Sequence, residues 1–127
     1  MAVLDPDNGG APEVLHGGAE RVAVRWHELP DAPSRAVGLS LYRVRPGERC
    51  GLHVHGGKTE TWLVVAGEAE VVRGEERLRV RVGDAVRTPP GVAHALANVG
   101  AGDVLFVNVV EPEPGVEPST VELEDVP

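Results

Sequence analysis

Two histidines and one glutamate lie close together in the stretch GLHVHGGKTETW, residues 51–62. His53 and His55 are separated by one residue, and Glu60 follows five positions after His55, in a chain with five histidines. On a strand over residues 50–55 the two imidazoles share one face, and Glu60 brings a carboxylate from the start of the next strand. Imidazole and carboxylate together suit Zn, Fe, Mn, Ni or Cu. The same short pattern also occurs as surface decoration, so this stretch alone leaves both interpretations open.

Cys50 is the single cysteine of the chain and stands just before these histidines. Strand alternation places Cys50, Leu52 and Val54 on the face opposite to His53 and His55. We therefore expect that Cys50 is not a metal ligand. A single cysteine also excludes an internal disulfide framework and is typical of a reducing compartment.

A second stretch, GDAVRTPPGVAHALAN at residues 83–98, carries His94 in another fixed spacing. Taken together, the two stretches resemble the cupin superfamily, which is marked by G-x5-H-x-H-x4-E-x6-G followed by G-x5-P-x-G-x2-H-x3-N. The chain fits both patterns with Gly47, His53, His55, Glu60 and Gly67, and then with Gly83, Pro89, Gly91, His94 and Asn98. The resemblance covers about residues 36–110, and its short inter-motif spacing is similar to that of compact, single-domain bacterial members.

The resemblance implies an all-β fold, a double-stranded β-helix or jelly-roll barrel, with one divalent transition metal in its mouth. His53, His55, Glu60 and His94 are then the metal ligands, and the metal is Fe, Mn, Ni, Cu or Zn. Four ligands leave positions open for water, O₂ or a chelating substrate. Glu60 is also the candidate catalytic residue, because a ligand that loosens when substrate arrives can act as a general base.

Three functions remain open at this point. The first is a metal-dependent enzyme that acts on a small organic molecule, with dioxygenase-type chemistry as the first choice. The second is a sugar or sugar-phosphate isomerase or epimerase, because ETWLVVAGEAEVVRG, residues 60–74, resembles the cupin part of type II mannose-6-phosphate isomerases. The third is a module that binds a small ligand without turnover, since a fold does not settle a function.

The walls of the substrate pocket are less well defined by the sequence. Trp62 has the same strand parity as Glu60 and is interpreted either as a pocket wall or as core. Lys58 shares that parity and either contacts an anionic substrate group or lies solvated in a loop. Of Tyr42 and Arg43, only one can point inward. The remaining histidines, His16 and His27, are expected to be incidental. We expect a mostly aliphatic pocket lining.

Short β-rich runs separated by Gly, Pro and Asp must position these residues. The pattern predicts strands over residues 21–28, 36–45, 50–55, 60–66, 68–73, 76–82, 85–88, 93–98 and 103–110, with no helical periodicity. The clearest hairpin spans residues 68–82, with a turn at Gly74-Glu75 that places Glu70 opposite Arg79 and Glu68 opposite Arg81. Its aliphatic residues then share the inner face.

Length and charge define the rest of the organisation. We expect a flexible lead-in over 1–19, the barrel over 20–110 and an acidic, solvated tail over 111–127 that holds six of the acids. The net charge of −8 and the absence of a basic stripe argue against nucleic acid as a partner. No secretion signal or membrane span is visible, which predicts a cytoplasmic protein. The apolar run around Val107 and Val109 favours a homodimer, because a strand that is apolar on both faces needs a cover.

Overall fold

The computed structural model describes residues 13–22 and 38–124, and every regular element in these ranges is a strand. The all-β class predicted from the sequence is thereby confirmed. The strands are β1 (Glu13–Val14), β2 (Glu20–Val22), β3 (Gly38–Val44), β4 (Arg49–Gly56), β5 (Lys58–Ala66), β6 (Glu68–Arg73), β7 (Glu76–Arg81), β8 (Ala85–Thr88), β9 (His94–Asn98), β10 (Val104–Pro112) and β11 (Ser119–Glu122).

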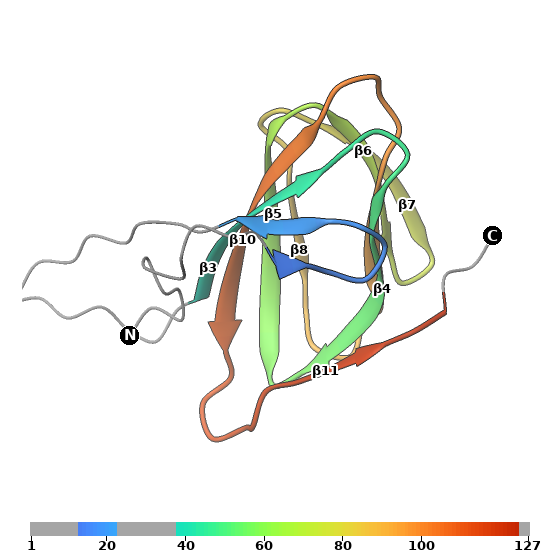
Figure 1. Ribbon diagram of the computed structural model, residues 1–127. Coiled ribbons are helices and arrows are strands. Elements are labelled where there is room, and N and C mark those ends of the chain that lie inside the picture. The colour runs from blue at the N-terminus through green and yellow to red at the C-terminus, as the bar shows by residue number, and fades with distance from the viewer. Residues whose placement is uncertain (1–12, 23–37, 125–127) are drawn as a thin grey trace, which may run out of the picture.

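The strands form two antiparallel sheets that face each other (Figure 1). One sheet has the order β1-β2-β3-β10-β5-β8, and the other has the order β11-β4-β9-β6-β7. Large buried side chains from both sheets meet between them, with Trp62 and Phe106 from the first sheet and Val71 and Leu96 from the second. Burial of these aliphatic and aromatic groups is the main force that holds the two sheets together.

The predicted strands agree closely with the observed ones. All eight predictions between residues 36 and 110 correspond to a strand whose ends differ by no more than two residues. The strand predicted over 21–28 is observed as β2 up to Val22, and its remainder, with Trp26 and His27, lies outside the described residues.

The hairpin β6–β7 has the predicted register. Glu68 pairs with Arg81 and Glu70 with Arg79, and Gly74 in the turn has a φ of 60°. The ion pairs themselves are diagonal, since Arg77 contacts Glu70 at 2.9 Å and Arg79 contacts Glu68 at 3.4 Å. The inner face, which includes Ala69, Val71 and Val80, is buried as expected.

Both predicted extensions of the barrel contain regular structure. In the lead-in, β1 pairs with β2, and in the acidic segment β10 extends to Pro112 and β11 pairs with β4. Residues 119–122 thus form a strand within the predicted tail, and all four of them are exposed, as a solvated segment would be.

The outer face of the six-stranded sheet carries one continuous aliphatic row. Val22 pairs with Leu41, Leu41 with Val107, Val107 with Leu63, and Leu63 with Ala85, so the row crosses five strands. In the described part of the chain, no helix is long and apolar enough to cross a membrane. The cytoplasmic location stays a prediction.

Candidate metal centre

The structure brings the side chains of His53, His55, Glu60 and His94 together between the two sheets. One ligand-type atom from each residue lies within 4.8 Å of the corresponding atoms of the others. The centre of the cluster is Glu60 Oε1, which lies 2.7 Å from His55 Nε2, 2.8 Å from His94 Nε2 and 3.6 Å from His53 Nε2. Three imidazoles that turn the same nitrogen toward one carboxylate oxygen form a donor set that fits a divalent transition metal.

The other nitrogen of each imidazole is held by an oxygen atom. His53 Nδ1 lies 2.7 Å from the carbonyl of Gly51, and His94 Nδ1 lies 3.1 Å from the carbonyl of Val92. A carbonyl only accepts hydrogen bonds, so these two Nδ1 atoms carry a proton, and Nε2 is the nitrogen that faces Glu60 and that a metal would bind. His55 Nδ1 lies 2.8 Å from Thr120 Oγ1, a side-chain partner. Such outer contacts orient metal-binding histidines.

Burial and charge favour the ionised carboxylate of Glu60 and the neutral imidazole of His94. Burial alone would raise the pKa of Glu60, but the hydrogen bonds from His53, His55 and His94 outweigh it and hold that pKa far below its usual value. Burial also lowers the pKa of His94. A carboxylate and a neutral imidazole are the protonation states that bind metal.

Glu60 is fixed at its second oxygen by Asn108, which the sequence analysis treated only as an interruption of an apolar run. Asn108 Nδ2 donates a 2.8 Å hydrogen bond to Glu60 Oε2 and lies 3.5 Å from Tyr42 Oη. Asn108 and Glu60 are 2% and 5% exposed, so water does not compete freely for this bond. The strand parity of Asn108, inward beside Phe106, was the available signal in the sequence.

A β-bulge in β4 sets the direction of the histidines. Cys50 pairs with Leu96 and His53 pairs with His94, so Gly51 and Leu52 together oppose a single residue of β9. The extra residue reverses the alternation, and Cys50 points inward on the same side as His53. The predicted parity of Cys50 is therefore wrong, although Cys50 is not part of the four-residue cluster.

Aromatic side chains of the core pack against the cluster. Trp62 is 2% exposed, and its ring centroid lies 4.8 Å from that of His94 and 5.1 Å from that of Phe106. Trp62 thus packs as core against His94, and it is not among the residues that line the cavity at the centre. Of the pair Tyr42 and Arg43, Tyr42 is the one that points inward.

A cavity of about 180 Å³ opens onto three members of the cluster, His53, His55 and Glu60. Its wall is largely polar, because Lys58, Arg21 and Tyr42 contribute to it, and the expected aliphatic lining is wrong. The remaining lining residues are Leu15, His16, Cys50, Gly51, Thr120 and Glu122. Burial, together with the nearby carboxylate of Glu60, raises the pKa of Tyr42, so its hydroxyl keeps its proton and can donate.

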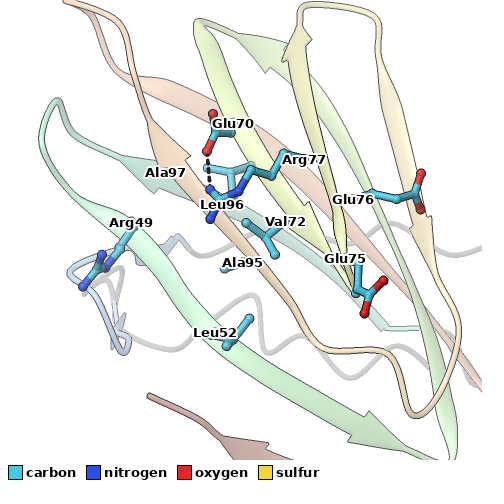
Figure 2. A pocket seen from close by; sticks show the side chains of 11 residues that line it. Arg49, Leu52, Glu70, Val72, Glu75, Glu76, Arg77, Ala95, Leu96 and Ala97 are labelled. Atoms are coloured by element: carbon cyan, nitrogen blue, oxygen red, sulfur yellow. Dashed lines mark hydrogen bonds and ion pairs between the residues drawn. The ribbon is translucent and has the colours of Figure 1, made fainter. Parts of the chain in front are cut away.

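Figure 2 shows a different and larger hollow, of about 380 Å³, on the outer surface of the five-stranded sheet. Its aliphatic floor comes from Leu52, Val72 and Ala95, and the ion pair between Arg77 and Glu70 crosses one side. No histidine lines it, and the four clustered residues lie inside the barrel. Of these two hollows, the smaller one is therefore the one that opens onto the cluster.

Asn98, the last residue of the second motif, has a structural role. Its amide Nδ2 donates to the carbonyls of Val44 (2.9 Å) and Gly102 (2.8 Å), and its Oδ1 accepts from the amide of Gly100 (2.8 Å). These bonds tie the end of β9 to β3 and to the loop before β10. Asn98 thus holds the barrel around the centre through bonds that involve none of the four clustered residues.

Comparison with known proteins agrees with this geometry. The family model of the cupin domain matches residues 40–110. A crystal structure of an uncharacterized protein with a double-stranded β-helix domain from Klebsiella pneumoniae superposes with a TM-score of 0.62 and 23% identity, covering 96% of this chain and 91% of that one. The double-stranded β-helix fold is thereby confirmed.

Two curated relatives are similar over part of the chain. The xanthan biosynthesis protein XanB of Xanthomonas campestris is 44% identical over 57 residues, which are 45% of this chain and 12% of XanB. The oxalate-binding protein of Thermotoga maritima is 29% identical over 77 residues, which are 61% of this chain and 64% of that protein. The chain therefore spans about an eighth of XanB and less than two thirds of the Thermotoga protein.

Proposed function

The chain belongs to the cupin family, and on this premise we propose that it is a metal-dependent enzyme acting on a small organic acid. His53, His55, Glu60 and His94 hold one divalent transition metal in this proposal. The observation that carries it is the convergence of three Nε2 atoms on Glu60 Oε1. We place the reaction among dioxygenase-type oxidations first, since such a donor set suits the redox metals Fe, Mn, Ni and Cu as well as Zn.

The bound metal would act as a Lewis acid or an O₂ site for a substrate that chelates it. The residues of the chain bind and orient that substrate. Lys58 and Arg21 contribute positive charge to the cavity wall and match a carboxylate, and the protonated hydroxyl of Tyr42 offers a hydrogen bond. Glu60, held at Oε2 by Asn108, is placed to take a proton if its other oxygen is released.

The size of the cavity supports a small ligand, and its wall offers the cations Lys58 and Arg21 beside the carboxylates of Glu60 and Glu122. A volume of about 180 Å³ admits a molecule of only a few heavy atoms. The similarity to a protein named for oxalate binding points to the same chemical class. A small carboxylate is therefore our choice over a larger apolar compound.

Metal content is the first test of this proposal. Protein purified without chelator or affinity-tag nickel should contain about one equivalent of Fe, Mn, Ni or Cu, and the His53→Ala/His94→Ala variant should contain none. Oxygen uptake with a panel of small carboxylic acids then tests the reaction. Release of CO₂ without oxygen uptake would replace oxidation by decarboxylation, and no metal after reconstitution would overturn the proposal.

A sugar-phosphate isomerase or epimerase is the second candidate, supported by the resemblance of residues 60–74 to the cupin part of type II mannose-6-phosphate isomerases and by the 44% identity to a protein named for xanthan biosynthesis. A sugar phosphate needs a cationic group for the phosphate, and Lys58 and Arg21 are the cavity cations for that contact. Zinc in the native protein and a rise in melting temperature with mannose 6-phosphate would support this candidate. A rise with oxalate, and none with the sugar phosphate, would reject it.

A binding module without turnover is the third candidate. The cavity and the cluster would serve ligand capture equally well, because binding needs the same open positions as catalysis. Tight binding of a carboxylate to the metal-loaded protein, with neither oxygen uptake nor a change in the ligand, would select this function.

We also propose that a second copy of the chain covers the aliphatic row on the six-stranded sheet. Leu63 and Val65 are 38% and 42% exposed there, and the five residues of the row carry no charge. The native protein should have twice the monomer mass by light scattering, and Leu63→Lys should halve it. Val121→Lys, on exposed β11, is the control and should leave the mass unchanged. A native monomer would reject the homodimer.

A further inference from the structure

The C-terminal strand β11 lies against the strand that carries two of the clustered histidines. β11 pairs with β4 at the edge of the five-stranded sheet, with Thr120 opposite His55 and Glu122 opposite His53 (Figure 1). Directly opposed residues of an antiparallel pair point to the same face. Thr120 and Glu122 therefore face the cavity that they help to line.

Two backbone contacts attach the same segment on either side of β11. The amide of Glu113 donates to the carbonyl of Gly57 at 2.8 Å, and the amide of Leu123 donates to the carbonyl of Leu52 at 2.9 Å. Gly57 has a φ of 72°, and a Cβ at this position would lie 2.8 Å from the carbonyl oxygen of Glu117. Glycine at position 57 thus lets the segment that contains Glu117 pack closely against the turn between His55 and Glu60.

His55 differs from the other two histidines in the group that holds its Nδ1 atom. Backbone carbonyls within two residues hold His53 and His94, whereas the hydroxyl of Thr120, 65 residues away in sequence, holds His55. A carbonyl partner moves with the strand that bears the histidine. A hydroxyl on β11 is present only while β11 is docked.

We propose that Thr120 is a positioning residue that links docking of β11 to metal affinity at His55. This inference rests on the metal centre proposed above. In this role the Thr120 hydroxyl oxygen accepts a hydrogen bond from the Nδ1–H group of His55, which directs the Nε2 lone pair to the metal and fixes the plane of the ring. When β11 is displaced, His55 loses this partner and the centre loses its preset geometry.

Linkage makes this effect reciprocal. If docked β11 strengthens metal binding by some factor, then bound metal strengthens docking of β11 by the same factor. β11 is short, its four residues are exposed, and among the described strands it pairs with β4 alone, so its docking is open to such a shift. The metal is therefore expected to protect residues 119–122, which include no member of the ligand cluster.

The test compares three variants of the full chain by competition with a chromophoric chelator, with Zn²⁺ as the probe metal. Thr120→Val keeps the shape and removes the hydroxyl, and it should weaken Zn²⁺ binding by about 10–100-fold. Thr120→Ser keeps the hydroxyl and should stay within about threefold of the native protein. Ser119→Ala removes a hydroxyl from the same strand while leaving Thr120 in place, and it should also stay within threefold.

Amide hydrogen exchange gives a readout that is independent of activity. In the native protein, Zn²⁺ should slow exchange in the peptide that covers residues 119–124, and in Thr120→Val this slowing should be lost. Equal Zn²⁺ affinity of Thr120→Val and the native protein would overturn the inference while leaving the metal centre intact. Absence of Zn²⁺ binding by the native protein would overturn the proposed function itself.

Discussion

The hydrogen bond from Asn108 to Glu60 offers a quantitative test of the centre. Asn108→Leu keeps the branching of the side chain and removes the donor that holds Glu60 Oε2 at 2.8 Å. Hydrogen bonds to a charged group contribute about 1.5–3 kcal/mol, and the burial of both residues places this bond toward the upper end. About 1.4 kcal/mol corresponds to a factor of ten. If metal binding loses the whole contribution of this bond, its affinity should therefore fall by about 10–150-fold.

The assay is again chelator competition, combined with chemical unfolding to separate affinity from stability. Asn98→Ala is the matched control, because Asn98 is also a buried asparagine with short hydrogen bonds but does not touch the ligands. Asn98→Ala should lose stability and keep its metal affinity, whereas Asn108→Leu should lose affinity. Metal affinity of Asn108→Leu within threefold of the native value would refute the assignment of Asn108 as the residue that fixes Glu60.

Four further outcomes follow from the structure. Asn98→Ala should lower the free energy of unfolding by about 2–4 kcal/mol, because three hydrogen bonds are lost and the buried carbonyl of Val44 is left without that donor, as urea unfolding will measure. Metal at 100 times its dissociation constant should stabilise the native protein by about 2.7 kcal/mol, and chelator should reverse the shift in calorimetry. Lys58→Gln should weaken binding of a small carboxylate to the metal-loaded protein in titration calorimetry and leave metal affinity unchanged, since Lys58 lines the cavity but is not in the cluster. Arg77→Ala should change stability by less than about 1 kcal/mol in the same urea assay, because its ion pair with Glu70 is solvent-exposed.

Alternation of apolar and polar residues was enough to predict most strands of the barrel. The register of the hairpin β6–β7 was predicted to the residue, because cross-strand charge pairs, an inner aliphatic face and a glycine turn all required the same pairing. The position of the four clustered residues came from the spacing of two motifs, which resemble those of a known family. Alternation alone places His53 and His55 on one face but does not bring His94 to them.

Three features of the centre depend on tertiary contacts and were missed. The bulge in β4 adds one residue opposite β9. The alternation of side chains along a strand does not reveal such an insertion, so Cys50 was assigned to the wrong face. β11 is a short edge strand with exposed residues, and its composition is typical of a solvated segment. Asn108 was visible as a polar residue on the inward face of an apolar strand, a position that requires a polar partner inside the barrel.

The outer edge of β7 has a consequence for how the molecule associates with others. Arg77, Arg79 and Arg81 are all exposed along this strand, which among the strands that the structure describes pairs with β6 alone. A foreign strand that joined the edge would have to bring its backbone alongside three guanidinium groups, and charged edge residues of this kind disfavour strand addition. Growth into open-ended, edge-to-edge assemblies is thereby discouraged at β7, and the homodimer proposed through the aliphatic sheet face would instead close after two copies.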